Sequence, residues 1–200
     1  GALSITNTTS AARGAAAARE GDTLTAMSTL ADADGIGTLH YQWLRGGLPI
    51  AGATTATYVP GNADIGTTIA VRATQTDARG TTSTATSGST GAIVNVDSAV
   101  TGAVAIVNLT SAGRGPTSPR IDDTLSVSDT LADDDRITTR GYQWLRDGIA
   151  IPGATADSYT LSSSDLGGRC SVRVTATDAF GGSGSVVSGA SGLVTTVLTQ

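Results

Sequence analysis

The sequence predicts an all-β protein, and three observations support that prediction. The chain of 200 residues repeats itself internally. Each copy contains short alternating segments separated by turn signals, which is the usual pattern of an all-β domain. Each copy also places one tryptophan, Trp43 or Trp144, in the middle of its third expected strand, where Ig sandwiches bury a central tryptophan. The expected fold is therefore two tandem Ig-like antiparallel β-sandwiches.

The repeat holds one register along the whole chain. The segment Tyr41–Arg45 recurs as Tyr142–Arg146, an offset of 101 residues, and residues 1–99 match residues 102–200 at 44 of 99 positions without a gap. A copy of about 100 residues has the usual size of one Ig-type domain. We therefore expect one Ig-like repeat over 1–98 and a second over 99–200, with a linker at about 96–102.

The elements of the first copy follow from alternating apolar residues and from Gly, Asn and Asp turns. Each strand is expected to end at a turn signal, and the Asp147-Gly148 pair of the second copy is a strong hairpin signal. Trp43 and Trp144 are expected to anchor the cores, and Cys170 is expected to be a small buried hydrophobe. Strands are expected at residues 3–5, 22–30, 39–45, 48–51, 57–59, 68–76 and 85–96, with a helical turn at 62–66 and a loop at the alanine-rich 15–18.

The composition argues against several classes of function. A net charge of −5 without a basic patch argues against nucleic acid as a partner. No run of about 18 apolar residues is present, so we expect no membrane insertion. Cys170 is the only cysteine, and hence the chain cannot form an intramolecular disulfide.

The sequence also predicts that the protein is not an enzyme. The single histidine, His40, has Gly141 as its counterpart, so no histidine-based catalytic group is repeated. No phosphate-binding glycine loop, zinc ligand cluster or nucleophile elbow is present. Asp64 and Asp165 lie in a D-x-G context, which we interpret as a turn cap in a corner common to Ig folds. We therefore expect no catalytic residues and no residues that bind an organic cofactor.

A series of short motifs resembles a known family. In order, the first copy contains GDTL at 21–24, DADG at 32–35, YQWLR at 41–45, IAGAT at 50–54, DIG at 64–66 and VRATQTD at 71–77. This series resembles the Ig-like repeats of large bacterial surface adhesins and of calcium-dependent secreted repeat proteins, and similar modules occur in phage structural proteins. The resemblance implies an extracellular stalk or display module that is commonly rigidified by calcium. Asp135-Arg136 departs from the DADG motif of the first copy.

Acidic loops are the candidate metal site. In an Ig sandwich, the loops after the second and sixth strands meet at the end that receives the preceding chain. Calcium takes 6–8 oxygen ligands from such loops, and converging acids repel one another unless a cation neutralises them. The alternative interpretation is that these residues only form turns in solvated loops. The expected Ca²⁺ ligands are Asp97, Asp133, Asp134, Asp135 and Asp178, with Asp32, Asp34 and Asp77 as the equivalent half-site of the first copy.

Three hypotheses for the function follow. The leading one is a structural spacer in a surface adhesin or repeat protein, stiffened by calcium at the domain junction, with neighbouring repeats as partners. The second is a phage decoration or tail-appendage protein with projecting Ig-like domains and other structural subunits as partners. The third is a carbohydrate-binding surface module, for which Phe180 is the best exposed aromatic candidate. All three place the protein outside the cell, on its surface or on a virion, where a host-surface protein or glycan is a further potential partner.

Overall fold

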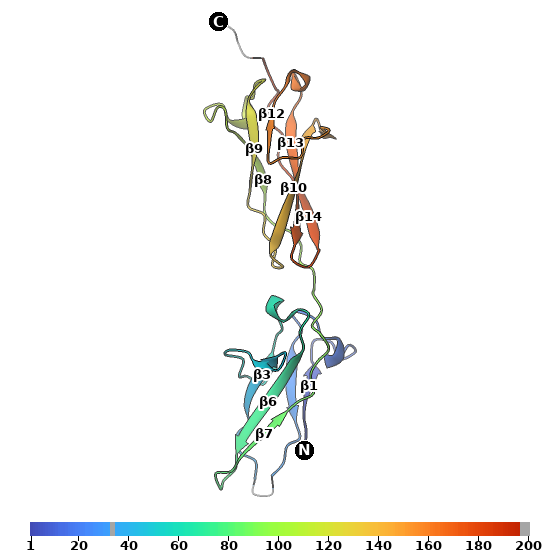
Figure 1. Ribbon diagram of the computed structural model, residues 1–200, viewed down its shortest axis with the longest axis vertical. Helices are drawn as coiled ribbons and strands as arrows, with labels where there is room; N and C mark the ends of the chain where they lie inside the picture. The colour runs from blue at the N-terminus through green and yellow to red at the C-terminus, as the bar shows by residue number, and fades with distance from the viewer. Residues whose placement is uncertain (33–34, 197–200) are drawn as a thin grey trace. The chain divides into compact units, whose positions relative to one another are not determined.

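The computed structural model describes residues 1–32 and 35–196, and the chain divides into two compact units. Unit 1 is Gly1–Val96 and unit 2 is Asp97–Gln200. Both units are built from antiparallel strands, with short 3₁₀ turns between some of them (Figure 1). Among the described residues, no helix has the length and apolar character needed to span a membrane.

Unit 1 contains a three-stranded sheet and a four-stranded sheet. The first has the order β1-β2-β5 and the second has the order β4-β3-β6-β7. Two 3₁₀ turns, η1 (Ala15–Ala17) and η2 (Asn62–Asp64), lie in the connections. The strands are β1 (Leu3–Asn7), β2 (Leu24–Ser28), β3 (His40–Arg45), β4 (Leu48–Pro49), β5 (Thr57–Tyr58), β6 (Ile69–Thr76) and β7 (Thr82–Thr86).

Unit 2 repeats this architecture strand for strand. Its three-stranded sheet has the order β12-β9-β8, and its four-stranded sheet has the order β11-β10-β13-β14. The 3₁₀ turns η3 (Gly115–Thr117) and η4 (Ser163–Asp165) correspond to η1 and η2. The strands are β8 (Val104–Asn108), β9 (Thr124–Asp129), β10 (Ile137–Arg146), β11 (Ile149–Ala150), β12 (Ser158–Thr160), β13 (Cys170–Asp178) and β14 (Ser183–Val187).

This strand order is that of an Ig-like sandwich. In each unit the first, second and fifth strands form one sheet, and the third, fourth, sixth and seventh form the other. The expected all-β fold of two tandem Ig-like antiparallel sandwiches is thus confirmed. The alternation along β6 agrees with this arrangement, because Ile69, Val71 and Ala73 are buried whereas Arg72 is exposed.

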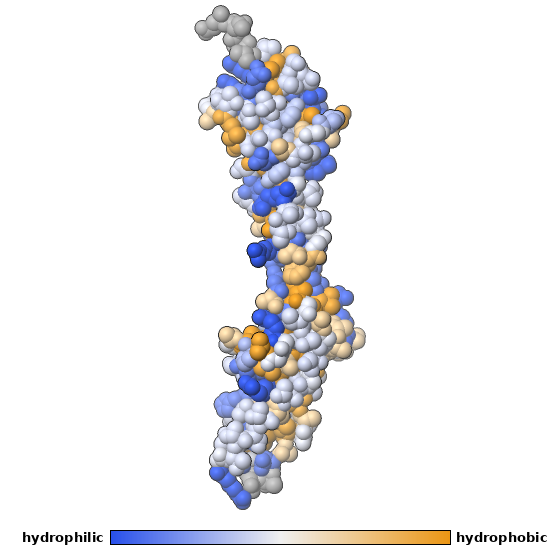
Figure 2. Space-filling view, in the orientation of Figure 1, coloured by the Kyte–Doolittle hydropathy of each residue, from blue (hydrophilic) through white to orange (hydrophobic). Residues whose placement is uncertain are grey.

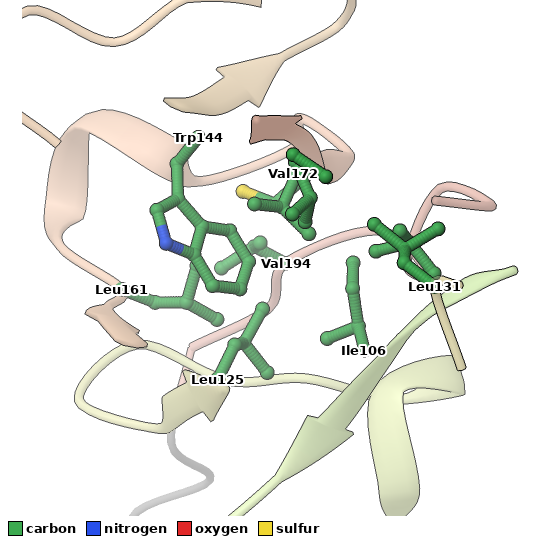
Figure 3. Packing of buried hydrophobic residues seen from close by; sticks show 11 residues of the cluster. Ile106, Leu125, Leu131, Trp144, Leu161, Val172 and Val194 are labelled. Atoms are coloured by element: carbon green, nitrogen blue, oxygen red, sulfur yellow. The ribbon is translucent and has the colours of Figure 1, made fainter. Parts of the chain in front are cut away.

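A tryptophan lies at the centre of each core, as expected. Trp43 and Trp144 are both fully buried, and each indole Nε1 donates a hydrogen bond to a backbone carbonyl, at 2.9 and 3.0 Å respectively. Each ring also packs against a tyrosine of the opposite sheet, Tyr58 or Tyr159, with ring centroids 5.6 and 5.8 Å apart. Figure 3 shows Trp144 surrounded by aliphatic side chains of unit 2. Each tryptophan therefore joins the two sheets of its own unit.

The last strand of the first copy differs from the sequence prediction. A strand at residues 85–96 was expected, but β7 is Thr82–Thr86. Beyond it, Ser87 and Thr90 use their hydroxyl groups to accept hydrogen bonds from backbone amides of β6, at 3.0 and 2.9 Å. These side chains take the place of strand carbonyls, so the ladder ends early. The alanine-rich segment 15–18, expected as a loop, contains the single 3₁₀ turn η1.

Hydrophobic surface is dispersed on the described units. The most exposed large hydrophobic residues, Leu48 (73%) and Ile149 (75%), occupy the same hairpin position in the two copies. On the face drawn in Figure 2, hydrophobic residues form small groups separated by hydrophilic and near-neutral residues. Scattered exposed apolar residues of this kind are normal for a soluble domain surface.

Candidate metal centre

Three carboxylates converge at one end of unit 2. Asp97, Asp135 and Asp178 each offer an oxygen atom, and these atoms all lie within 4.8 Å of one another. Asp97 is the first residue of unit 2, Asp135 lies in the loop between β9 and β10, and Asp178 ends β13. Segments far apart in the sequence therefore bring three negative charges to one place.

The loop between β9 and β10 is folded on itself. Asp133 Oδ1 accepts a hydrogen bond from the backbone amide of Asp135 at 2.9 Å, and Asp133 O accepts one from the amide of Arg136 at 3.1 Å. Arg136 adopts a positive φ of 66°, in the left-handed region that favours glycine. This turn directs the Asp135 side chain inward, where the residue is only 1% exposed.

Asp178 is buried, and one of its two carboxylate oxygens has no hydrogen-bond partner. Its Oδ1 accepts hydrogen bonds from the amides of Phe180 (2.6 Å) and Gly182 (3.0 Å), which closes the turn between β13 and β14. Its Oδ2 is buried and has no hydrogen-bond partner, although the residue is only 5% exposed. A buried carboxylate oxygen is normally hydrogen-bonded or bound to a cation. The orphaned oxygen is therefore an independent sign that this site receives a positively charged ligand.

Ser98 ties the entering segment of unit 2 to the acidic loop. Its backbone amide donates to Asp135 Oδ2 at 3.1 Å, and its hydroxyl donates to Asp133 Oδ1 at 2.9 Å. These bonds hold the neighbouring Asp97 beside the two buried carboxylates. The loop and the entering segment thus form one structural element.

The electrostatics of the cluster disfavour the charged form of Asp97. Loss of hydration raises the pKa of Asp97 most, and the adjacent Asp178 raises it further. The charges of Asp133 and Asp135 add to this increase in the pKa of Asp97. A bound cation would remove this repulsion, because it would pair with the carboxylates that now face one another.

The donor set suits a hard divalent cation. Carboxylate oxygens from flexible loops are the ligands that Ca²⁺ prefers, and backbone carbonyls or water complete its 6–8 contacts. No histidine or cysteine belongs to the group, so the ligands do not suit a structural zinc ion. Asp97, Asp135 and Asp178 are the residues that would hold the cation.

The remaining predicted ligands lie outside this three-residue group. Asp133 supports the loop and adds its charge, whereas Asp134 is exposed on the same loop. In unit 1, Asp32 precedes the undescribed pair 33–34, and Asp34 lies outside the described residues. Asp77 holds a turn of its own, and among the described residues of unit 1 no group of three metal-ligating side chains is found.

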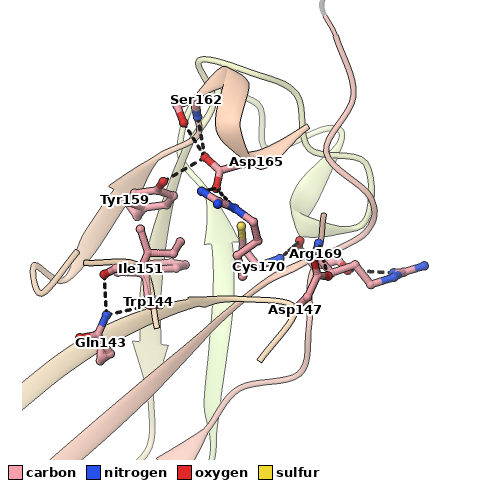
Figure 4. A network of polar contacts seen from close by, with 11 residues as sticks. Gln143, Trp144, Asp147, Ile151, Tyr159, Ser162, Asp165, Arg169 and Cys170 are labelled. Carbon is pink, nitrogen blue, oxygen red and sulfur yellow. Dashed lines mark hydrogen bonds and ion pairs between the residues drawn. The ribbon is translucent and has the colours of Figure 1, made fainter. Parts of the chain in front are cut away.

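The D-x-G aspartates close a buried corner in both units. Asp165 Oδ2 accepts hydrogen bonds from the amide and hydroxyl of Ser162 and from Tyr159 Oη, at 2.8, 2.9 and 2.9 Å (Figure 4). Asp165 Oδ1 accepts from Arg146 Nε at 2.7 Å. The interpretation of this aspartate as a turn cap is therefore confirmed, and Asp64 caps the equivalent turn of unit 1. A carboxylate engaged in this way supports the sandwich framework.

Other reactive side chains have ordinary surroundings. Cys170 is fully buried in the core, and burial raises the pKa of its thiol to about 12, so the thiolate is disfavoured. His40 is exposed at the start of β3. Phe180 is 45% exposed in the turn that Asp178 closes. The described residues place none of these side chains in a catalytic arrangement.

Sequence reasoning missed two residues of the site. Ser98 joins the entering segment to the loop, but a serine in the sequence does not by itself indicate a metal site. Gly182 leaves room for the carboxylates, because a Cβ at this position would overlap Asp97 Oδ1 and Asp178 Oδ2. Its counterpart in the first copy is Thr81, so a comparison of the copies at this position contains the signal.

No family model and no curated protein matches the chain. Similar solved structures include three N-terminal domains of the Highly Immunogenic Outer Capsid protein (Hoc) of bacteriophage RB49, with 16% identity and a TM-score of 0.31 over 96% of this chain and 58% of that chain. A Ca²⁺-stabilised adhesin with which an Antarctic bacterium binds ice has 18% identity and a TM-score of 0.36 over 100% of this chain and 50% of that chain. Tandem Ig repeats of Dlar have 12% identity and a TM-score of 0.28 over 90% of this chain and 93% of that chain.

This chain thus spans 58% and 50% of the length of the phage and adhesin structures. At TM-scores this low, they carry no argument about what the chain does.

Proposed function

We propose that the chain is a non-catalytic pair of Ig-like modules that serves as a structural spacer in an extracellular or surface-displayed protein, and that unit 2 binds Ca²⁺ where the chain enters it. The observation that carries this proposal is the orphaned, buried Asp178 Oδ2, which faces two other carboxylates. A framework without a catalytic arrangement among its described side chains supports a mechanical role.

The mechanism of such a spacer is the restriction of its connecting segment. Ser98 already bonds to the acidic loop, and a cation held by Asp97, Asp135 and Asp178 would add ionic contacts between that segment and unit 2. A segment held at several points samples fewer conformations than one held by hydrogen bonds alone. Calcium would therefore stiffen the connection between the two modules.

Calcium-dependent unfolding tests this proposal. At a calcium concentration about ten-fold above Kd, binding adds about 1.4 kcal/mol to the free energy of unfolding of unit 2. For a domain of this size, that increment raises Tm by about 5–10 °C. Each unit contains one tryptophan, so a Trp43→Phe background makes the fluorescence report unit 2 alone. Scans in chelator and in millimolar calcium are compared in that background.

Matched variants separate the site from general charge effects. Asp97→Asn and Asp178→Asn each remove one ligand, and both are expected to abolish the calcium-dependent rise in Tm. Asp157→Asn removes an exposed acid of unit 2 whose side chain lies outside the cluster, and it should keep the rise. The proposal is wrong if the wild-type chain gains no stability in millimolar calcium, or if all three variants respond alike.

Hydrogen exchange measures the stiffening itself. The amides of residues 97–101 are expected to exchange more slowly in calcium than in chelator, because the cation holds this segment to unit 2. The amides of β1 provide the control and should not change. A rise in Tm without protection of residues 97–101 would refute the role in the connecting segment and keep the cation site.

A further inference from the structure

Asp77 and Asp178 hold the same tight turn in the two units. Each aspartate follows or ends the sixth strand of its unit, and its Oδ1 accepts hydrogen bonds from the amides two and four residues later. These bonds measure 2.8 and 2.9 Å in unit 1 and 2.6 and 3.0 Å in unit 2. Any difference between the two carboxylates therefore comes from the side chains around them.

The fourth residue after each aspartate supplies that difference. In unit 1 it is Thr81, whose backbone amide donates to Asp77 Oδ1 at 2.9 Å. Backbone bonds from Thr81 contribute most to a lowered pKa of Asp77, so this carboxylate is stabilised in its charged form by its own turn. In unit 2 the residue is Gly182, which offers no hydroxyl, and Asp178 Oδ2 is left without a partner.

Gly182 also makes room for the third carboxylate. A Cβ on this residue would overlap Asp97 Oδ1 as well as Asp178 Oδ2. Its backbone is not among those with a positive φ, so the local conformation would accept another residue. The glycine is therefore required by the space that Asp97 occupies and not by the turn.

A second glycine repeats this relation two residues later. A Cβ on Gly184 would lie 2.8 Å from Val100 Cβ, and Val100 packs against the core of unit 2. The counterpart of Gly184 in unit 1 is Ser83. Gly182, just before β14, and Gly184, within it, therefore both lie against the segment that carries Asp97 and Val100.

We infer that Gly182 is a positioning residue that allows unit 2 to take the divalent cation. Gly182 admits Asp97 beside Asp178, because any larger residue would place a Cβ against both carboxylates. Unit 1 has Thr81 at the equivalent position. This inference rests on the cation site proposed above, and it assigns a role to a residue that does not ligate the metal.

The direct test is Gly182→Thr in the Trp43→Phe background, with calcium binding measured by titration. The variant copies Thr81, so unit 2 should keep its fold, as judged by circular dichroism. Its Tm in chelator should change little, because the exposed Asp97 side chain can move away from the new Cβ. Its calcium affinity should fall by about ten-fold or more, the usual scale for losing support around a metal site.

Two further variants make the outcome decisive. Gly182→Ala adds only the Cβ and should also weaken calcium binding, so it replaces the threonine variant if that protein does not fold. Thr81→Gly is the matched control in unit 1 and should leave the calcium affinity of the chain unchanged.

The outcomes separate the two proposals. If the wild-type chain does not bind calcium, the cation site itself is wrong. If the wild-type chain binds calcium and both Gly182 variants bind it equally well, the site stands and the role of Gly182 is wrong.

Discussion

Unit 1 and unit 2 share a framework and differ at one end. The buried tryptophan, the aspartate corner and the strand order are the same in both. The corner bonds from arginine Nε, tyrosine Oη and the capping amide measure 2.7, 2.8 and 2.9 Å in unit 1 and 2.7, 2.9 and 2.8 Å in unit 2. The two units differ where unit 2 seats Asp97 and Val100 against Gly182 and Gly184, because the counterparts of these glycines in unit 1 are Thr81 and Ser83. The duplication therefore preserves the scaffold, whereas the residues at this end of the sandwich differ between the copies.

The largest effect should come from the shared core. Trp43→Ala and Trp144→Ala each remove a fully buried ring that joins the two sheets of its unit. We expect each variant to lower the free energy of unfolding of its own unit by about 3–5 kcal/mol. Urea unfolding followed by circular dichroism measures this loss. If one substitution greatly lowers the free energy of unfolding and the other hardly changes it, the two cores are not equivalent.

The buried corner should give the next largest effect. Asp165→Asn removes the charge that accepts from Arg146 and Tyr159, and hydrogen bonds to charged groups contribute about 1.5–3 kcal/mol. Asp64→Asn should lower the stability of unit 1 by a similar amount, which urea unfolding of each variant measures. Tolerance of either substitution would show that the corner matters in only one copy.

The same corner predicts a loss of stability in acid. Burial raises the pKa of Asp165, but hydrogen bonds from Ser162, Arg146 and Tyr159 outweigh it, so its folded pKa lies below the ordinary 3.8. Its contribution to stability is therefore present above the unfolded pKa and is lost as pH falls through the folded pKa. Unfolding measured between about pH 5 and about pH 2 should show this loss in the wild type. Asp165→Asn should have a flatter profile, and an unchanged profile would contradict the assignment.

The smallest effect tests a conformational difference near the site. Arg136 has a positive φ of 66°, whereas its counterpart Gly35 has a positive φ of 91° with no side chain to strain it. Arg136→Gly should stabilise unit 2 by about 0.5–1 kcal/mol, because the relief of left-handed strain exceeds the gain in unfolded-state entropy. Gly35→Ala should destabilise unit 1 by a similar amount. Thermal unfolding of the two variants measures both changes. Shifts of the same sign in Tm would show that Arg136 is not strained by its positive φ.

Much of the fold could be predicted because the sequence patterns that indicate strands and turns occur in both copies. Trp43 and Trp144 in equivalent strands predicted the core, and the D-x-G pair predicted the corner. The end of the last strand could not be predicted, since Ser87 and Thr90 replace backbone partners with hydroxyl groups. Whether a side chain bonds to its neighbours in this way depends on the distance between strands, which local composition does not encode.

The candidate site could be predicted in part for a similar reason. The aspartates of two loops and of the linker before the second copy pointed to a set that includes Asp97, Asp135 and Asp178, which the fold brings together. Sequence gave no means of separating these three from Asp133 and Asp134, because alternate loop residues face different directions. The difference between Thr81 and Gly182 marks this position in the sequence, but the reason for the glycine follows from the position of Asp97 in space.

Calorimetric titration of calcium into the wild-type chain is the direct test of the cation site in unit 2. We expect one calcium ion per chain, because Asp97, Asp135 and Asp178 are the one group of three metal-ligating side chains among the described residues. If the heat of calcium binding is lost in Asp178→Asn and retained in Asp77→Asn, the ion lies in unit 2. Absence of binding would refute the cation site, and a second ion that is lost in Asp77→Asn would refute its restriction to unit 2.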